Sequence, residues 1–242
     1  KAIEKNNPKI IQRLLEDPNV DPNVKLYVDS KEVTLLSMAI EKDDFELMKL
    51  LLLSPKTDSC ILLETGYSFQ YTPLSMAIEK NYDIETIKLL IKDRDIDINT
   101  KFNTKGFQKI LETVIHTELE KTALSLLIEM NKIELVQFLL SNKNINPNIK
   151  LIKKYIDDHH GYVNEEKTVL SIAIENEDVR MLKLLLSCPI IDPNVKLSIE
   201  DSYSGIILEE NTALQIAVSK GNKEIICHLF DDQRTNRLPF RF

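Results

Sequence analysis

Residues 168–175 read Thr-Val-Leu-Ser-Ile-Ala-Ile-Glu, and this pattern recurs along the chain. Identical or altered copies of Thr-x-Leu-Ser-x-Ala-Ile-Glu begin at Thr34, Thr72, Thr122 and Thr212. A truncated sixth copy opens the chain as Ala2-Ile3-Glu4. Successive threonines lie 38 to 50 residues apart. A motif that returns at such an interval indicates a repeat architecture, in which each unit buries its apolar face against the next.

Each unit is predicted to contain two short antiparallel helices. In the second unit Thr34 can cap a helix that carries Leu36, Ala39 and Ile40 on one face. The small alanine would let neighbouring helices approach closely. A second apolar stripe follows after a polar break, and Pro55 ends it; this stripe consists of Leu47, Met48, Leu51 and Leu52.

The connections between units are predicted to be enlarged β-hairpins. Four of them contain one glycine each, which we place at the hairpin tip where positive φ is needed; these are Gly66, Gly106, Gly161 and Gly205. Alternating apolar residues flank them, as in half-buried strands. The connection from Lys101 to Lys121 fits an extra helix as well as a long hairpin. For residues 102–121 the sequence predicts either structure equally.

The repeats resemble ankyrin repeats. The resemblance rests on the opening Thr72-Pro73-Leu74-Ser75, on the second helix Glu134-Leu135-Val136-Gln137-Phe138-Leu139-Leu140, and on the turn Asp192-Pro193-Asn194. Two features depart from the family pattern. Its histidine is replaced by serine or glutamine, so the hydrogen bonds between repeats must be made differently, and its glycine between the helices occurs only as Gly221.

The resemblance implies a mainly α fold, an ankyrin-type helical repeat solenoid with β-hairpin fingers between repeats. We expect a single array over residues 1–242, as a fragment of a longer chain. Its units are predicted at residues 1–33, 34–71, 72–121, 122–167, 168–211 and 212–242. The function implied is that of a protein–protein interaction scaffold, which binds a partner through a concave face formed by first helices and fingers.

Composition excludes several classes of partner. The chain has 38 acidic and 31 basic residues and a net charge of −7, which disfavours nucleic acid and anionic membrane surfaces. No apolar stretch approaches the roughly 20 residues needed to span a bilayer. Three widely separated cysteines, Cys60, Cys188 and Cys227, are typical of reduced thiols. We therefore expect a monomeric intracellular protein, in the cytoplasm.

Catalytic chemistry is not expected, and no cofactor is predicted. The strongest candidate for a metal site is Asp157-Asp158-His159-His160, whose side chains are competent ligands. Four adjacent residues beside a hairpin glycine lack the i, i+4 spacing that aims two ligands at one point. A solvated turn is the favoured interpretation. A metal-dependent hydrolase is the least favoured functional hypothesis.

Aromatic residues gather in the fingers and are candidates for partner binding; they include Tyr27, Tyr67, Phe69, Tyr155, Tyr162 and Tyr203. Rigid aromatic rings are enriched among residues that dominate binding energy. Packing of one hairpin against another is the alternative role.

A row of glutamates is the second candidate binding feature. The residue two after the alanine position is Glu41, Glu79, Glu129 and Glu175, preceded by Glu4 in the truncated copy. Helical geometry places it off the buried stripe, so the row would favour a partner protein with a basic segment. The alternatives are that glutamate is simply a good exposed helix residue, and that the chain is a structural spacer within a larger protein.

Overall fold

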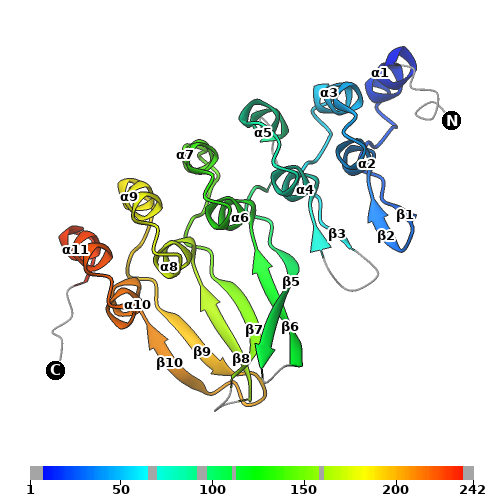
Figure 1. Ribbon diagram of the computed structural model, residues 1–242. Coiled ribbons are helices and arrows are strands. Elements are labelled where there is room, and N and C mark those ends of the chain that lie inside the picture. The colour runs from blue at the N-terminus through cyan, green and yellow to red at the C-terminus, as the bar shows by residue number, and fades with distance from the viewer. Residues whose placement is uncertain (1–7, 65–69, 92–96, 111–112, 158–160, 237–242) are drawn as a thin grey trace. The chain divides into compact units, whose positions relative to one another are not determined.

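The structure is a computed structural model that describes the chain apart from residues 1–7, 65–69, 92–96, 111–112, 158–160 and 237–242. It divides into two compact units, Lys1–Asn103 and Thr104–Phe242. Each unit contains pairs of short antiparallel helices, joined by β-hairpins that project from one side (Figure 1).

The first unit contains five helices and two small hairpins among its described residues. In chain order they are α1 (Pro8–Glu16), β1 (Leu26–Val28), β2 (Lys31–Val33), α2 (Leu35–Glu41), α3 (Phe45–Leu53), β3 (Leu63–Glu64), β4 (Gln70–Tyr71), α4 (Pro73–Glu79) and α5 (Ile84–Ile91). Inner helices α2 and α4 pack together, as do outer helices α1 and α3.

The second unit contains six helices and six strands among its described residues. They are β5 (Phe102–Ile110), β6 (Thr113–Lys121), α6 (Ala123–Glu129), α7 (Ile133–Leu140), β7 (Leu151–Asp157), β8 (Gly161–Lys167), α8 (Val169–Glu175), α9 (Val179–Ser187), β9 (Leu197–Asp201), β10 (Ile207–Asn211), α10 (Ala213–Lys220) and α11 (Lys223–Asp231). Inner helix α8 packs between α6 and α10, and outer helix α9 packs against α11.

The motif threonine begins each inner helix with a reciprocal cap. In the α8 repeat the Thr168 N–H donates to Ser171 Oγ at 3.0 Å, and the Ser171 hydroxyl donates to the Thr168 carbonyl at 2.9 Å. The same bonds occur in the α2, α4 and α6 repeats. The serine that replaces the family histidine therefore satisfies backbone groups within its own repeat, where both residues are buried.

The turn between the two helices has a left-handed residue in each of the five repeats where the structure describes it, and glycine supplies it in one of these. The residues with positive φ are Asp43, Asn81, Asn131, Glu177 and Gly221. In the α8 repeat Glu177 has φ 54°, and the next N–H, of Asp178, donates to the Ala173 carbonyl at 3.1 Å. The turn is thus kept by residues other than glycine, at the steric cost that a left-handed conformation carries for side chains with a Cβ.

The connection at residues 102–121 forms strands over residues 102–110 and 113–121, not a helix. Its strands β5 and β6 join β7 to β10 in one six-stranded sheet with order β10-β9-β8-β7-β6-β5. The structure is 43% helical and 20% strand, so the prediction of a mainly α fold is only partly right. Gly161 and Gly205 have the positive φ expected near hairpin tips, whereas Gly106 lies inside β5.

An asparagine in the turn after each of the outer helices α1, α7 and α9 links one repeat to the next. Its amide donates to one backbone carbonyl of the next turn and accepts from a nearby N–H. Asn148 bonds the Ile190 carbonyl at 2.7 Å and the Asp192 N–H at 2.8 Å. Asn23 and Asn194 make the equivalent pairs of bonds. These asparagines make hydrogen bonds between repeats that the serines do not.

Glutamates two residues before the capping threonine link successive hairpins. We call them the linking glutamates: in each, Oε2 accepts a main-chain N–H from the residue 32 positions later. The bonds are Glu32 to Glu64 at 3.1 Å, Glu120 to Ile152 at 2.9 Å and Glu166 to Ser198 at 3.0 Å. Glu32 and Glu166 also accept a lysine ammonium, from Lys25 at 2.9 Å and Lys150 at 2.8 Å. Each such carboxylate therefore joins its own hairpin to the next.

Overpacking the alanine position should destabilise the second unit. Ala173 is 1% exposed on α8, which packs between two helices. Ala173→Leu should lower the free energy of unfolding by about 1–3 kcal/mol, because the added methyl groups force neighbours apart. Urea denaturation measures the change. Gln137→Leu, on the exposed side of α7, should change it by less than about 0.5 kcal/mol. Equal effects would show that the packed face is elsewhere.

Acid should weaken the link made by Glu166. Burial raises the pKa of this carboxyl, but hydrogen bonds from Lys150 and Ser198 outweigh it and hold the pKa below 4.5. The stabilisation is therefore complete above pH 4.5 and is lost as the pH falls through the lowered pKa.

Glu166→Gln should consequently lower the melting temperature at neutral pH. On acidification to about pH 3, the melting temperature of the variant should fall by less than that of the parent. Thermal unfolding followed by circular dichroism across this range is the measurement. Glu134→Gln, an exposed change on α7, is the control and should follow the parent. Parallel curves for Glu166→Gln and the parent would contradict the assignment.

Candidate partner-binding surface

A cleft of about 210 Å³ lies between the hairpin sheet and the inner helices of the second unit. Strands β6, β7 and β8 form one wall, and the ends of α6 and α8 form the other. Its apolar lining is Leu119, Leu151, Ile152 and Ile172, and its charged lining is Glu120, Glu129, Lys153, Lys167 and Glu175. Two glutamates of the predicted row, Glu129 and Glu175, thus face the same cleft.

Both glutamates hold a lysine from the end of the hairpin that directly precedes their helix. The Lys121 ammonium lies 2.5 Å from Glu129 Oε2, and the Lys167 ammonium lies 2.5 Å from Glu175 Oε2. Each lysine directly precedes the capping threonine, so a hairpin end and a helix end are tied together in both repeats. Lys167 also lies 3.4 Å from Glu165. The row in this unit is therefore a series of ion pairs, a feature that spacing along single helices did not indicate.

The first unit places Glu41 and Glu79 at the exposed ends of α2 and α4. Near them, the Lys80 ammonium donates to the Glu41 carbonyl at 2.8 Å and to Asp43 Oδ1 at 2.9 Å. The Tyr82 hydroxyl donates to the same Asp43 oxygen at 2.6 Å. These two bonds, with that of Tyr82 the stronger influence, lower the pKa of Asp43. The glutamate at the row's beginning, Glu4, lies outside the described residues.

The candidate aromatic residues fall into distinct settings. Tyr27 on β1 is 71% exposed. The Lys153 ammonium lies 4.5 Å from the centroid of the Tyr155 ring, close enough for a cation–π interaction. Tyr162 and Tyr203 belong to neighbouring hairpins and meet edge to face, with ring centroids 5.8 Å apart and exposures of 52% and 81%. This pair joins two hairpins and still presents aromatic surface.

Two of the candidates, Tyr67 and Phe69, lie outside the described residues, as do Asp158, His159 and His160. Within the described ranges, no group of three or more His, Cys, Asp or Glu side chains is placed to hold a metal ion. All three cysteines are free. Burial is the main influence that raises the pKa of Cys60 to about 12, which keeps this thiol protonated at neutral pH.

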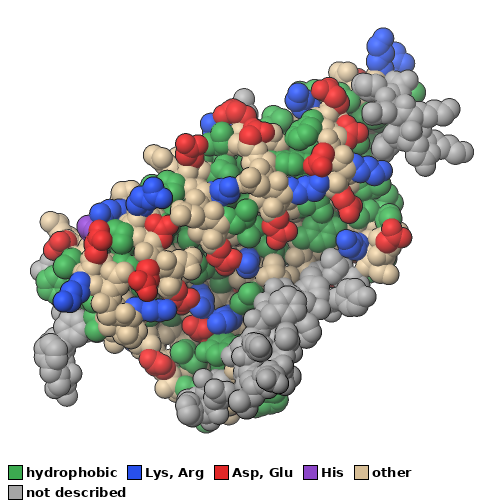
Figure 2. All heavy atoms as spheres, viewed as in Figure 1, with side chains coloured by type: hydrophobic (Ala, Val, Ile, Leu, Met, Phe, Trp, Pro, Cys, Tyr) green, Lys and Arg blue, Asp and Glu red, His purple; other side chains and the backbone are tan. Residues whose placement is uncertain are grey.

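Charges of both signs are mixed over the visible surface. In Figure 2 acidic and basic side chains are interspersed and do not gather by sign. Across the strands of the hairpin sheet, lysines face glutamates: Lys154 lies 2.8 Å from Glu118, and Lys153 lies 3.6 Å from Glu165. In the part of the chain that the structure describes, no helix is long and apolar enough to cross a membrane.

Comparisons with known proteins agree with this architecture. Residues 1–102 match the family model described as ankyrin repeats (3 copies). The solved structure of EF0377, an ankyrin repeat protein, is similar with a TM-score of 0.56 and 21% identity, over 95% of this chain and 94% of that one. No significant match is found among curated proteins.

A second similar structure is the ankyrin repeat domain of Bcl-3, a member of the IκB protein family. Its TM-score is 0.58 and its identity 16%, over 96% of this chain and 84% of that one. At these identities both likenesses concern the fold. The family model shows ankyrin repeats within residues 1–102, and the two structural likenesses show that the chain has an ankyrin repeat fold.

Proposed function

We propose that this chain is a binding scaffold that holds a partner protein on the surface between its inner helices and hairpins. Ankyrin repeats generally mediate protein–protein interaction and are a non-enzymatic module. The observation that carries the proposal is the cleft between β6, β7, β8 and the ends of α6 and α8. Apolar side chains and charges of both signs meet there, as they do in protein interfaces.

The partner segment that suits this cleft combines apolar and basic side chains. Glu129 and Glu175 each hold one lysine, and a carboxylate offers about four lone-pair sites. An arginine or lysine of the partner could therefore bind each glutamate beside Lys121 or Lys167, without displacing either. The net charge of −7 would also speed the approach of a basic segment.

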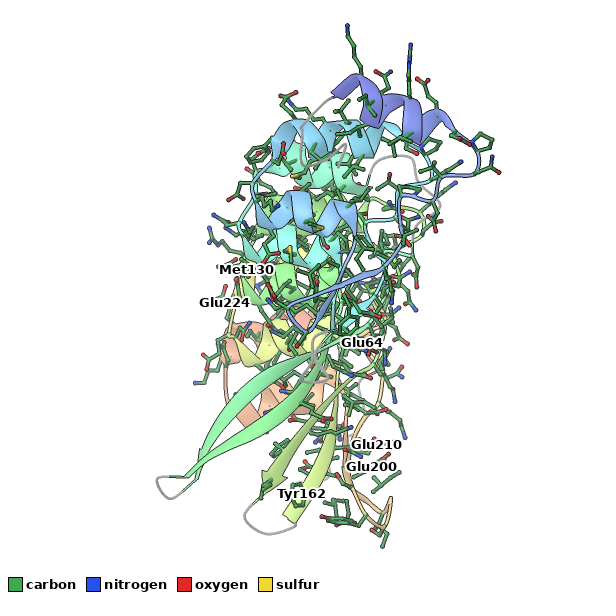
Figure 3. All side chains as sticks on the ribbon, turned by 90° about the vertical axis from the view of Figure 1, so that its right-hand side faces the viewer. Glu64, Met130, Tyr162, Glu200, Glu210 and Glu224 are labelled. Atoms are coloured by element: carbon green, nitrogen blue, oxygen red, sulfur yellow. The ribbon has the colours of Figure 1, made fainter. Side chains whose placement is uncertain are left out.

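Exposed aromatic rings extend the proposed surface. Tyr162 and Tyr203 present their edges and faces at one hairpin pair, and Figure 3 shows Tyr162 near the end of the sheet that is far from the helices. Tyr155 already carries an ammonium over its ring, which is the kind of contact a partner lysine or arginine would make with the exposed rings. A partner that crosses the hairpins could bury them at small entropic cost.

Neutralising the inner glutamates should weaken this binding. Affinity capture from the source cell, quantified by mass spectrometry, would compare the parent with Glu41→Gln, Glu79→Gln, Glu129→Gln and Glu175→Gln combined. We expect at least one partner to be depleted with the variant, and its parent affinity to fall with added salt because charge steers the association.

The matched control carries the same four changes on outer helices, at Glu46, Glu85, Glu134 and Glu224. It should capture the partner as the parent does. Equal capture by both quadruple variants would reject the inner surface. Capture of no protein by the parent would instead favour a spacer.

A further inference from the structure

Two kinds of contact occur among the linking glutamates, and within the described residues the glutamate of the last hairpin makes one of them. Glu32, Glu120 and Glu166 each accept an N–H from the next hairpin, always 32 residues later. Glu210 occupies the same position, two residues before Thr212. Gln70 takes this position in the remaining repeat.

Glu210 makes the ion pair with a lysine that Glu32 and Glu166 also make. Its Oε2 lies 2.6 Å from the ammonium of Lys196, as Glu32 and Glu166 each hold a lysine of their own hairpin. The Glu210 side chain is 42% exposed, compared with 20% for Glu32 and 23% for Glu166. The residue 32 positions later, Phe242, lies outside the described residues. Glu210 lies on β10, and no other described strand follows β10 in the sheet order.

β10 is thus one of the two edges of the six-stranded sheet, and β5 is the other. β10 pairs with β9 and is the last strand in the sheet order. Edge strands present main-chain N–H and C=O groups to any added strand. On this edge Ile206 is 63% exposed, Ile207 56% and Leu208 37%. Three consecutive exposed apolar residues would gain from being covered.

The charges beside this edge favour a basic strand. Residues 196–211 carry four carboxylates, those of Glu200, Asp201, Glu209 and Glu210, and one ammonium, that of Lys196. Glu200 and Glu210 lie together on the β9–β10 hairpin (Figure 3). Inside the sheet, strand neighbours match glutamate with lysine, as in Lys154 with Glu118. A strand added to β10 would continue that pattern if it placed lysine or arginine opposite Glu209.

A second copy of this chain fits the edge poorly. Antiparallel pairing of β10 with another β10, centred on Glu209, would bring the two Glu209 side chains directly opposite each other. Like charges at directly opposed positions destabilise a strand pair. The bulge between Ile207 and Glu209 would distort such a symmetric pairing further.

We propose that the open edge of β10 is a docking site for an extended basic segment of a partner protein, which adds as the seventh strand of the sheet. Main-chain hydrogen bonds along β10 hold the segment, and the Glu210 carboxylate accepts one of its N–H groups. Alternate apolar side chains of the segment cover Ile207 or Leu208, and its basic side chains face Glu209. This surface is separate from the cleft at α6 and α8.

The probe is an acetylated and amidated heptapeptide, Lys-Val-Lys-Val-Lys-Val-Lys, titrated to millimolar concentration into the isotope-labelled chain. Nuclear magnetic resonance should show amide shifts centred on residues 207–211. Glu209→Lys should weaken the peptide about tenfold, because an attractive charge becomes repulsive. Glu134→Lys makes the same change on α7 and should leave the affinity as it is.

Backbone pairing is tested by two N-methylated peptides, one methylated on its valines and the other on its inner lysines. An edge strand pairs with only every second residue of its neighbour, so one peptide should bind and the other should not. Equal binding of both, or no binding of the parent peptide, would overturn the proposal.

Three further outcomes would also overturn it. Shifts at Glu129 and Glu175 in place of β10 would assign the basic segment to the inner cleft, and so support the proposed function alone. Protection of β10 amides that disappears when residues 237–242 are deleted would show that the chain covers its own edge. Concentration-dependent dimers with shifts at β10 would show that a second copy does.

Discussion

The length of the inner helices is the constraint on which the rest of the structure depends. Helices α2, α4, α6 and α8 have seven residues each, well below the roughly 12–15 at which isolated helices become stable in water. They persist because apolar side chains pack them against the next helices, and because threonine and serine satisfy their first backbone groups inside the protein. The left-handed turn and outer helix then return the chain for the next hairpin.

Polar side chains set the spacing and register of neighbouring hairpins. An asparagine amide such as that of Asn148 makes two bonds to the next turn, and a carboxylate such as that of Glu166 takes an N–H from the next hairpin. Each such hydrogen bond contributes about 0.5–1.5 kcal/mol, so a neighbour in the wrong register would lose stability. The hairpins of the second unit consequently form one sheet and are not independent loops.

The same arrangement makes surfaces for binding. Where hairpins meet inner helices, Lys121 and Lys167 hold Glu129 and Glu175 in place, so a partner would meet positioned charges beside apolar side chains. On the edge strand β10, Glu210 is held by Lys196 in the same way that Glu32 and Glu166 are held by a lysine. In both proposed sites, a carboxylate is held in place by a lysine of the hairpin next to it.

Local sequence determined the repeats, their two helices, the buried alanine position and the capping threonines, because helix periodicity and caps depend on residues within about four positions. It also predicted hairpins in the connections, but it placed Gly106 at a tip when that residue lies within β5, and residues 102–121 fitted helix and strand equally. Only tertiary structure decided that these residues join a six-stranded sheet, and that Glu120 and Glu166 reach the next hairpin. Those choices rest on contacts between residues 32 positions apart, whose meeting depends on the packing of every element between them.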